Sequence, residues 1–119
     1  MPYVDGFLLA VPKKKLAAYR RISRAAGKVW RDHGALEYRE CVGDDLKTTM
    51  GVAFPAVAKA KAAEAVVFSW IVYKSRAHRD RVNAKVMKDP RMVKAMKEPM
   101  PFDIKRMSYG GFKVLVDMS

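Results

Sequence analysis

Apolar side chains dominate two segments of the chain and lie on both faces of each. Tyr3 to Val11 (YVDGFLLAV) contains few polar residues, and Ala65 to Tyr73 (AVVFSWIVY) is the longest strongly apolar run. Both segments are rich in β-branched and aromatic residues, which predicts two strands. Because side chains alternate along a strand, such runs are apolar front and back, as in a sheet that is covered on both faces.

A long amphipathic pattern follows the first of these strands. Pro12 ends the strand, and apolar residues then recur at helical spacing from Lys13 to His33, with Gly34 placed to end the helix. Leu36 to Val42 (LEYRECV) then alternates apolar and polar residues. This alternation predicts a half-exposed strand at the edge of a sheet.

The pattern weakens between Gly43 and Glu64, where we expect a loop with a short irregular piece over Met50–Val57. Pro55 argues against a central strand in this segment. Ser75 is placed to cap a helix over Arg76–Lys88.

A second cap stands at Asp89, where Asp89-Pro90 predicts the start of a short helix over Arg91–Lys97. Glu98 to Phe102 contains two prolines and is predicted to be a loop. The last strand is predicted over Ile104–Val116, although Gly110 and Gly111 interrupt it.

The predicted order of elements is strand, helix, strand, strand, helix, strand. This βαββαβ order specifies an α+β fold of the ferredoxin-like kind, with a four-stranded antiparallel sheet in one domain over residues 1–119. In that fold the first and third strands are central, which agrees with their apolar composition. The second strand carries Glu37, Arg39 and Glu40, as an edge strand does.

The apolar character of the sheet has a consequence for assembly. Two helices cover only one face of a four-stranded sheet, so the other face would expose a large apolar patch. We expect a second copy of the chain to cover it, sheet against sheet, in a two-fold homodimer. The alternative is that the Gly43–Glu64 segment folds over the same face.

Four stretches of the sequence carry a family resemblance: YVDGFLLAVP, VVFSWIVYKSRAHRD, KVMKDPRM and MPFDIKRMSYGGF. They resemble the YbaA-like family of small bacterial proteins of unknown function, a member of the dimeric α+β barrel superfamily. The resemblance implies a homodimer whose two sheets form a barrel. It implies no activity.

The chain is strongly basic, with 24 Lys and Arg against 12 Asp and Glu and a net charge of +12. Eight basic residues fall between Lys13 and Arg31 and nine between Lys74 and Lys97, in the two predicted helical regions. Such clusters favour binding to nucleic-acid phosphates. Basic residues also occupy the solvent face of any amphipathic helix, and the sequence has no aromatic RNA-binding signature, so we rank nucleic acid below a small-molecule ligand.

Glycines and a group of polar residues mark a candidate ligand site. The last strand is expected to pair with the first, which brings Gly110 and Gly111 close to Gly6 and leaves room above the sheet. The opposing interpretation is a β-bulge or a close approach by another element. The candidate ligand-binding residues are His78, Asn83, Asp103, Arg106, Tyr109 and Gly110.

Each charged member of this group also has a structural interpretation. Asp103 can pair with Arg106 or Lys105 to fix a loop, and His78 can lie in the first turn of an exposed helix. The functional interpretation is that an Asp–Arg pair and a histidine bind an anion or move a proton. Both interpretations fit the sequence.

Several kinds of chemistry have no motif here. The chain has two histidines and one cysteine with no pair at metal-ligand spacing, no phosphate-binding glycine loop and no nucleophile motif, so we expect no metal and no cofactor. Cys41 has no partner for an internal disulfide, which favours a reducing compartment. We find no signal peptide and no apolar run long enough to cross a membrane, and expect a cytoplasmic protein.

We expect a cytoplasmic homodimer. The resemblance to dimeric α+β barrels, many of which hold an organic ligand between sheet and helices, implies that it binds a small organic molecule in such a pocket. This expectation covers both a binding protein and a cofactor-independent enzyme. The alternatives are RNA or DNA binding through the basic helices, and a structural or regulatory dimer that binds another protein.

Overall fold

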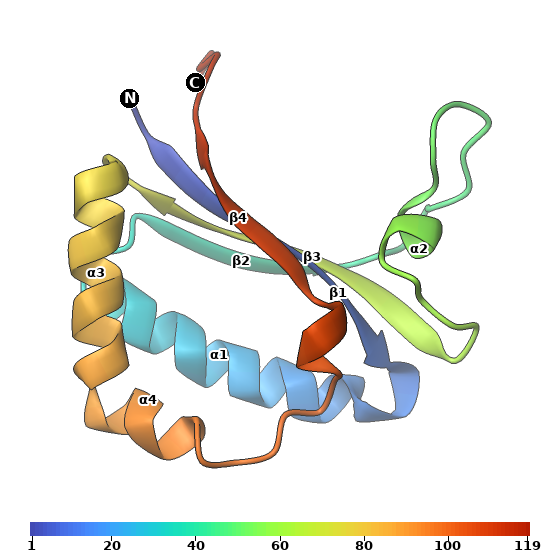
Figure 1. Ribbon diagram of the computed structural model, residues 1–119, viewed down its shortest axis with the longest axis horizontal. Coiled ribbons are helices and arrows are strands. Elements are labelled where there is room, and N and C mark those ends of the chain that lie inside the picture. The colour runs from blue at the N-terminus through green and yellow to red at the C-terminus, as the bar shows by residue number, and fades with distance from the viewer.

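The chain forms a four-stranded antiparallel sheet with its longer helices on one face, as the computed structural model of residues 1–119 shows (Figure 1). The elements are β1 (Tyr3–Pro12), α1 (Leu16–Asp32), β2 (Glu37–Val42), α2 (Phe54–Val57), β3 (Glu64–Tyr73), α3 (Arg76–Lys88), α4 (Pro90–Ala95) and β4 (Ser108–Lys113). Short 3-10 helices span Lys13–Lys15 and Ile104–Arg106. None of the helices has the length and apolar composition needed to cross a membrane.

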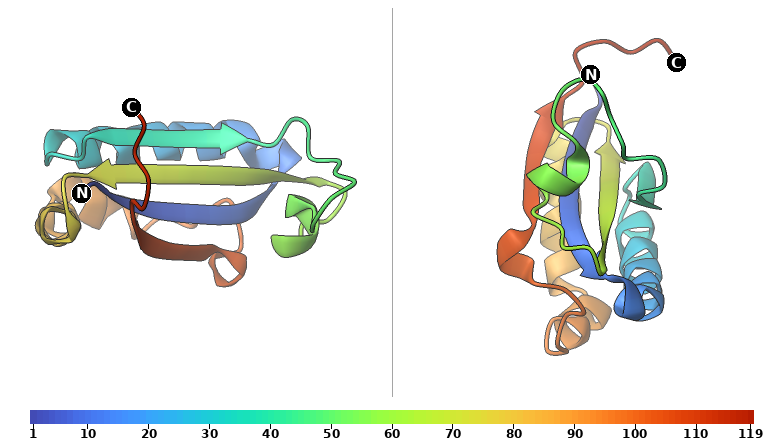
Figure 2. Two further views of the ribbon diagram at one scale, coloured as in Figure 1. Left: turned by 90° about the horizontal axis from the view of Figure 1, so that it is seen from above. Right: turned by 90° about the vertical axis from the view of Figure 1, so that its right-hand side faces the viewer.

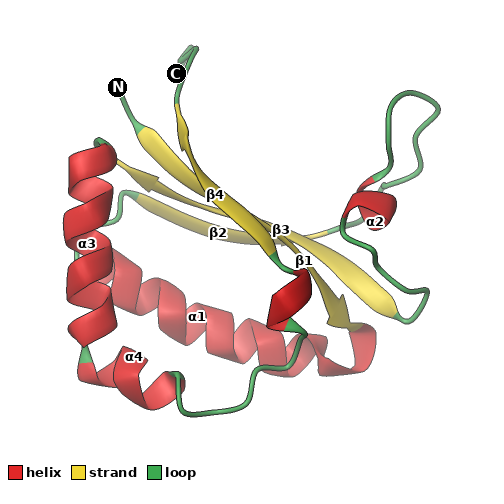
Figure 3. Ribbon diagram, viewed as in Figure 1, coloured by secondary structure: helices red, strands yellow, loops and turns green.

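The strand order is β2-β3-β1-β4, with the two apolar strands in the centre (Figures 2 and 3). This confirms the predicted ferredoxin-like α+β fold and its two edge strands. Tyr3 pairs with Tyr73 on one side of β1, and Gly6 pairs with Gly110 on the other. The β1–β4 ladder is continuous through both glycines of β4, so there is no bulge there.

The prediction for the last strand was wrong at both ends. Ile104–Arg106 forms a 3-10 helix because the Asp103 carboxylate accepts a hydrogen bond from the backbone N–H of Lys105 and holds a turn. At the other end β4 stops at Lys113, which pairs with Tyr3, the first residue of β1. Beyond Lys113, β4 has no residue of β1 left to pair with, so it ends there although the following residues are apolar.

The predicted caps are confirmed. Ser75 Oγ accepts a hydrogen bond from the backbone N–H of His78 at the start of α3, and Asp89 accepts one from Arg91 at the start of α4. Gly34 follows α1 with φ of +112°, a left-handed conformation that glycine adopts at low cost. The N-terminal part of the first predicted helix, Lys13–Lys15, is a 3-10 turn instead of an α-helix.

The core lies between the sheet and the helices on its lower side in Figure 1. Odd-numbered residues of β1 and β3 point into it and pack against α1 and α3. The members with the least exposure are Leu9, Val11, Val67, Ile71, Tyr73, Val29, Val82 and Val86. Burial of these side chains holds both helices on one face of the sheet.

The other face of the sheet is apolar and largely uncovered. It carries Val4, Leu8, Phe68, Trp70, Val72 and Phe112, and we call it the open face. The helix α2 covers one end of it, where Phe54 contacts Phe68 edge-on with ring centroids 6.0 Å apart. Phe112 remains 62% exposed, so the Gly43–Glu64 segment covers only part of this face.

Candidate functional site

A partly open pocket of about 200 Å³ lies between the sheet and α1, and we call it the internal cavity. Its wall is mainly apolar, with Phe7 and Ile71 from the sheet, Ile22 from α1, and Phe102 and Met107 from the segment that leads into β4. Ser23 and Ser69 are two of the few polar residues that line it. A mostly apolar space with a small number of polar groups is the usual composition of a small-molecule site.

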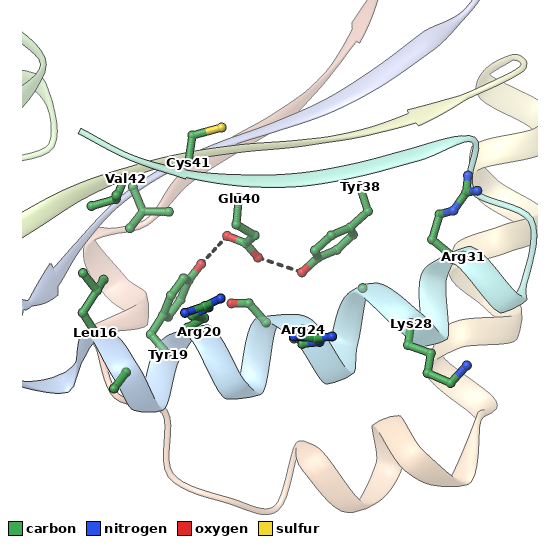
Figure 4. A pocket seen from close by; sticks show the side chains of 14 residues that line it. Leu16, Tyr19, Arg20, Arg24, Lys28, Arg31, Tyr38, Glu40, Cys41 and Val42 are labelled. Atoms are coloured by element: carbon green, nitrogen blue, oxygen red, sulfur yellow. Dashed lines mark hydrogen bonds between the residues drawn. The ribbon is translucent and has the colours of Figure 1, made fainter. Parts of the chain in front are cut away.

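One side of this cavity is lined by two tyrosines that donate to the same carboxylate (Figure 4). Tyr19 on α1 donates to Glu40 Oε1 at 2.6 Å, and Tyr38 on β2 donates to Glu40 Oε2 at 2.7 Å. Burial and the Glu40 charge raise the pKa of both phenols well above the usual value. Both hydroxyls therefore stay protonated and keep donating at neutral pH. We call this group the tyrosine–carboxylate partition.

The alternation of β2 and a glycine on α1 build this partition. Tyr38 and Glu40 point toward α1 because they lie opposite Ile71 and Ser69, whose side chains face the helices. Gly27 lets the helix approach, since a Cβ there would lie 2.7 Å from the Tyr38 ring. A larger residue at position 27 would push β2 and α1 apart.

A larger groove of about 830 Å³ lies outside the partition, between α1 and β2 (Figure 4). Tyr19, Ser23, Tyr38 and Glu40 line both this groove and the internal cavity, so the two spaces adjoin. The groove also carries four basic residues of α1: Arg20, Arg24, Lys28 and Arg31. We call these four residues the basic row.

A second polar cluster lies beneath the opposite end of the sheet. Asp5 is only 7% exposed, and burial raises its pKa, although Arg79 at 3.8 Å opposes this shift. Arg79 also donates to the Tyr3 hydroxyl at 3.2 Å. The cluster pairs a buried carboxylate with a guanidinium and ties α3 to β1.

Two of the candidate ligand-binding residues predicted from the sequence, His78 and Asn83, lie on α3 beside this cluster. Asn83 Oδ1 accepts hydrogen bonds from Trp30 Nε1 at 3.0 Å and from the Tyr73 hydroxyl at 3.1 Å, and so joins α1, β3 and α3. His78 Nδ1 accepts from the backbone N–H of Lys74 at 2.9 Å. Partial burial and nearby Lys74 lower the pKa of His78.

Asp103 and Arg106 lie together at the start of β4, with 3.6 Å between Asp103 Oδ2 and Arg106 Nε. Arg106 also forms a two-pronged ion pair with Glu64, which fixes this turn to the start of β3. Tyr109 is 72% exposed on the edge strand and stacks on Phe7 with ring centroids 6.0 Å apart. The Arg106–Glu64 pair lies at the end of the sheet far from His78 and Asn83, since Glu64 pairs with Pro12, the last residue of β1.

Gly110 lies on the open face, directly opposite Gly6, and the Phe112 ring rests over both. The neighbouring Gly111 points the other way, where a Cβ would lie 2.8 Å from the Tyr3 ring. Gly6 and Gly110 are therefore paired as predicted, but the Phe112 ring fills the space above them, and only Gly111 has a close approach, by Tyr3 on the other face. None of the six predicted site residues lines the cavity or the groove described above.

Sequence reasoning missed the residues that do line these spaces. Tyr38 and Glu40 share one face of a strand whose alternation was clear, and Tyr19 lies on the apolar face of α1. The contact of Tyr19 with Glu40 depends on how α1 packs against β2, and the pattern of apolar and polar residues along the sequence does not predict that packing. No three His, Cys, Asp or Glu side chains gather to hold a metal ion.

Comparison with known proteins places the chain in a family. Residues 2–104 match the family described as "Protein of unknown function (DUF1428)". The chain belongs to this family. It is also 47% identical over 117 residues to the uncharacterized protein YbaA of Escherichia coli strain K12, which covers 98% of this chain and 99% of that protein. The YbaA-like resemblance predicted from the sequence is confirmed.

Three solved structures have similar folds. Rv0793 from Mycobacterium tuberculosis superposes with a TM-score of 0.60 at 13% identity over 100% of both chains. A NIPSNAP domain protein from Burkholderia xenovorans gives 0.58 at 12% identity, over 98% of this chain and 97% of that one. A dimeric ferredoxin-like protein from an uncultured marine organism gives 0.50 at 15% identity, over 100% and 99%. At these identities the likeness is one of fold.

Proposed function

We propose that this protein is a homodimer that binds a small organic molecule in the internal cavity between the sheet and α1. The observation that carries the proposal is the cavity itself, which is lined mainly by apolar side chains and has a few polar groups in its wall. An apolar ligand gains binding energy from removal of its surface from water. The polar groups would then orient it.

The tyrosine–carboxylate partition supplies the polar contacts in this proposal. A ligand carbonyl or hydroxyl that reaches Tyr19 or Tyr38 competes with Glu40 for the phenolic proton. The ligand class that fits is therefore a compact apolar molecule with one hydrogen-bonding group. His78, Asn83, Asp103 and Arg106 keep structural roles, since their side chains are used to hold elements together.

The homodimer in this proposal is supported by the open face. A sheet surface that carries Phe68, Trp70 and Phe112 is costly to leave in water. The neighbour from the marine organism is described as dimeric, which agrees with two such sheets facing one another.

Cys41 is exposed and has no disulfide partner, which supports a reducing, cytoplasmic location.

Binding of the neutral dye N-phenylnaphthylamine tests the cavity. We expect its fluorescence to rise on binding the wild-type protein, because the dye enters an apolar space. Ala26 lines the cavity and Ala25 is exposed on the same helix. Ala26→Leu fills part of the space and is expected to weaken dye binding about tenfold, since the added side chain takes volume that the dye needs.

Ala25→Leu is the matched control and is expected to bind the dye as the wild type does. Thermal melting of all three proteins shows whether the Ala26→Leu protein is folded, and Ala26→Val provides a smaller change at the same position. Equal dye affinity in folded wild-type and Ala26-substituted proteins, or no binding to any of them, would contradict the proposal.

A further inference from the structure

The basic row of α1 follows one stripe of the helix along the outer groove. Arg20, Arg24 and Lys28 are spaced four residues apart, and Arg31 follows three residues later, so all four project from one side. The groove adjoins the internal cavity through the residues of the tyrosine–carboxylate partition, which line both. A molecule that occupies the cavity therefore has a row of positive charges beside its outer end.

Few acidic residues of the chain neutralise the basic row. Glu40 is the one acidic residue in the groove wall, and its two oxygens are occupied by Tyr19 and Tyr38. Arg20 and Arg24 make no ion pair and no side-chain hydrogen bond in the structure. Their guanidinium groups keep all of their donors free.

The other two members of the row are partly occupied. Lys28 lies 3.8 Å from Asp32, but Asp32 is also bound by Arg91 at 2.8 Å. Arg31 donates to the backbone carbonyls of Ala35 and Leu36 and fixes the turn before β2. The free positive charge therefore concentrates at Arg20 and Arg24, beside the partition.

We infer that the groove binds the anionic group of an organic molecule whose apolar part occupies the internal cavity. The inference rests on the proposed function and names its ligand class: a hydrophobic carboxylate, phosphate or sulfonate. A guanidinium presents parallel N–H donors that match two oxygens of such a group. Neutralisation of the row by a ligand also relieves repulsion among four neighbouring positive charges.

The geometry favours a small anion over nucleic acid at this position. Arg20 and Arg24 border a concave space whose wall contains two tyrosines and the apolar side chains of Leu16 and Val67. A duplex backbone needs charges spread over a surface that it can reach, and gains nothing from an apolar recess. A small amphipathic anion uses both parts of the site.

Two dyes of matched shape test the inference. Anilinonaphthalene sulfonate carries a sulfonate that N-phenylnaphthylamine lacks, so their affinities differ by the contribution of the anionic group. We expect the sulfonate dye to bind the wild-type protein at least about tenfold more tightly than the neutral dye, in line with a charge-assisted hydrogen bond. The difference should decrease as salt is added.

The double variant Arg20→Gln/Arg24→Gln is expected to lose this preference and keep its affinity for the neutral dye. Both side chains are exposed and unpaired, so the fold should be unaffected. Arg21→Gln/Lys85→Gln is the matched control, because it removes the same net charge from two exposed residues outside the groove. The control should keep the sulfonate preference.

The outcomes separate this inference from the proposed function. If the neutral dye binds in the cavity but the sulfonate dye has no advantage, or if the control variant loses the advantage equally, the anion site is refuted and the cavity proposal stands. If neither dye responds to Ala26→Leu, the proposed function fails first. A short RNA that needs Arg20 and Arg24 for binding, with no preference between the dyes, would assign the row to nucleic acid and overturn the inference.

Discussion

At the residue scale, the most specific feature is the pair of phenols that share the Glu40 carboxylate. Tyr19 comes from α1 and Tyr38 from β2, so one acidic side chain fixes the distance between a helix and an edge strand. Buried hydroxyls that lost this acceptor would each cost about 1–3 kcal/mol. Glu40 therefore has a structural value to the fold as well as a place in the wall of the cavity.

The two adjacent glycines of β4 lead to a prediction at the same scale. Gly111→Ala is expected to lower the free energy of unfolding by about 1–3 kcal/mol, because its methyl group would meet the Tyr3 ring at 2.8 Å. Tyr3 has no easy escape, since it is 7% exposed and contacts Arg79. Urea unfolding followed by circular dichroism measures the change.

Gly110→Ala is the matched control, since it makes the same substitution on the opposite face. The nearest atom to its new methyl group is in the Phe112 ring at 4.0 Å, an ordinary contact. We expect a change within about 0.5 kcal/mol. Equal destabilisation by the two substitutions would show that the Tyr3 contact is not the reason for the glycine.

At the element scale, local patterns of apolar and polar residues predicted most of the secondary structure. The strands β1 and β3 and the caps at Ser75 and Asp89 follow from short-range rules, and these predictions are confirmed. The error over Ile104–Val116 has a different cause. The length of β4 is set by its pairing with β1. The apolar pattern of one segment does not show which residues of another strand it will pair with.

A prediction at this scale concerns the connection between the turn before β4 and the start of β3. Hydrogen bonds from Arg106 and from the backbone of Lys61 lower the pKa of Glu64 from 4.5 to about 2. Because the folded-state pKa is depressed, the ion pair stabilises the fold above about pH 4.5, and the contribution is lost as the pH falls toward 2. Glu64→Gln should therefore lower the melting temperature at neutral pH.

The difference in melting temperature between wild type and Glu64→Gln should shrink as the pH falls through this range. Differential scanning calorimetry at a series of pH values measures it. Glu98→Gln is the control, because Glu98 is exposed and makes no ion pair in the structure, and it should follow the wild-type curve. A gap between wild type and Glu64→Gln that stays constant down to pH 2 would show that the pair does not stabilise the turn.

At the scale of the whole molecule, the apolar open face is the feature that was best predicted from the sequence. Alternation along β1 and β3 showed both faces of the sheet to be apolar, and the structure puts helices on one face and α2 over only one end of the other. The candidate site was harder to predict. Its wall combines α1, β2, β3 and the segment before β4, and their side chains meet only after the chain has folded.

The assembly prediction belongs to this scale. Phe112→Glu is expected to convert the proposed homodimer into a monomer, because it places a carboxylate in the apolar contact between the two sheets. Phe112 is 62% exposed in the single chain, so the fold of the subunit should survive the change. Sedimentation velocity at micromolar concentration measures the mass, and circular dichroism confirms the fold.

Met87→Glu is the matched control for assembly. Met87 is 46% exposed on α3, away from the open face, and its substitution should leave the mass of the assembly unchanged. A wild-type protein that sediments as a monomer, or a Phe112→Glu protein that remains a dimer, would contradict sheet-to-sheet assembly.

The tyrosine–carboxylate partition is a wall shared by two compartments, and this makes them interdependent. A guest on the groove side that draws a phenol away from Glu40 alters the lining of the inner chamber at the same moment. For two separate ligands, occupancy on one side would then change the affinity on the other, and thermodynamic linkage would require the influence to run equally in both directions.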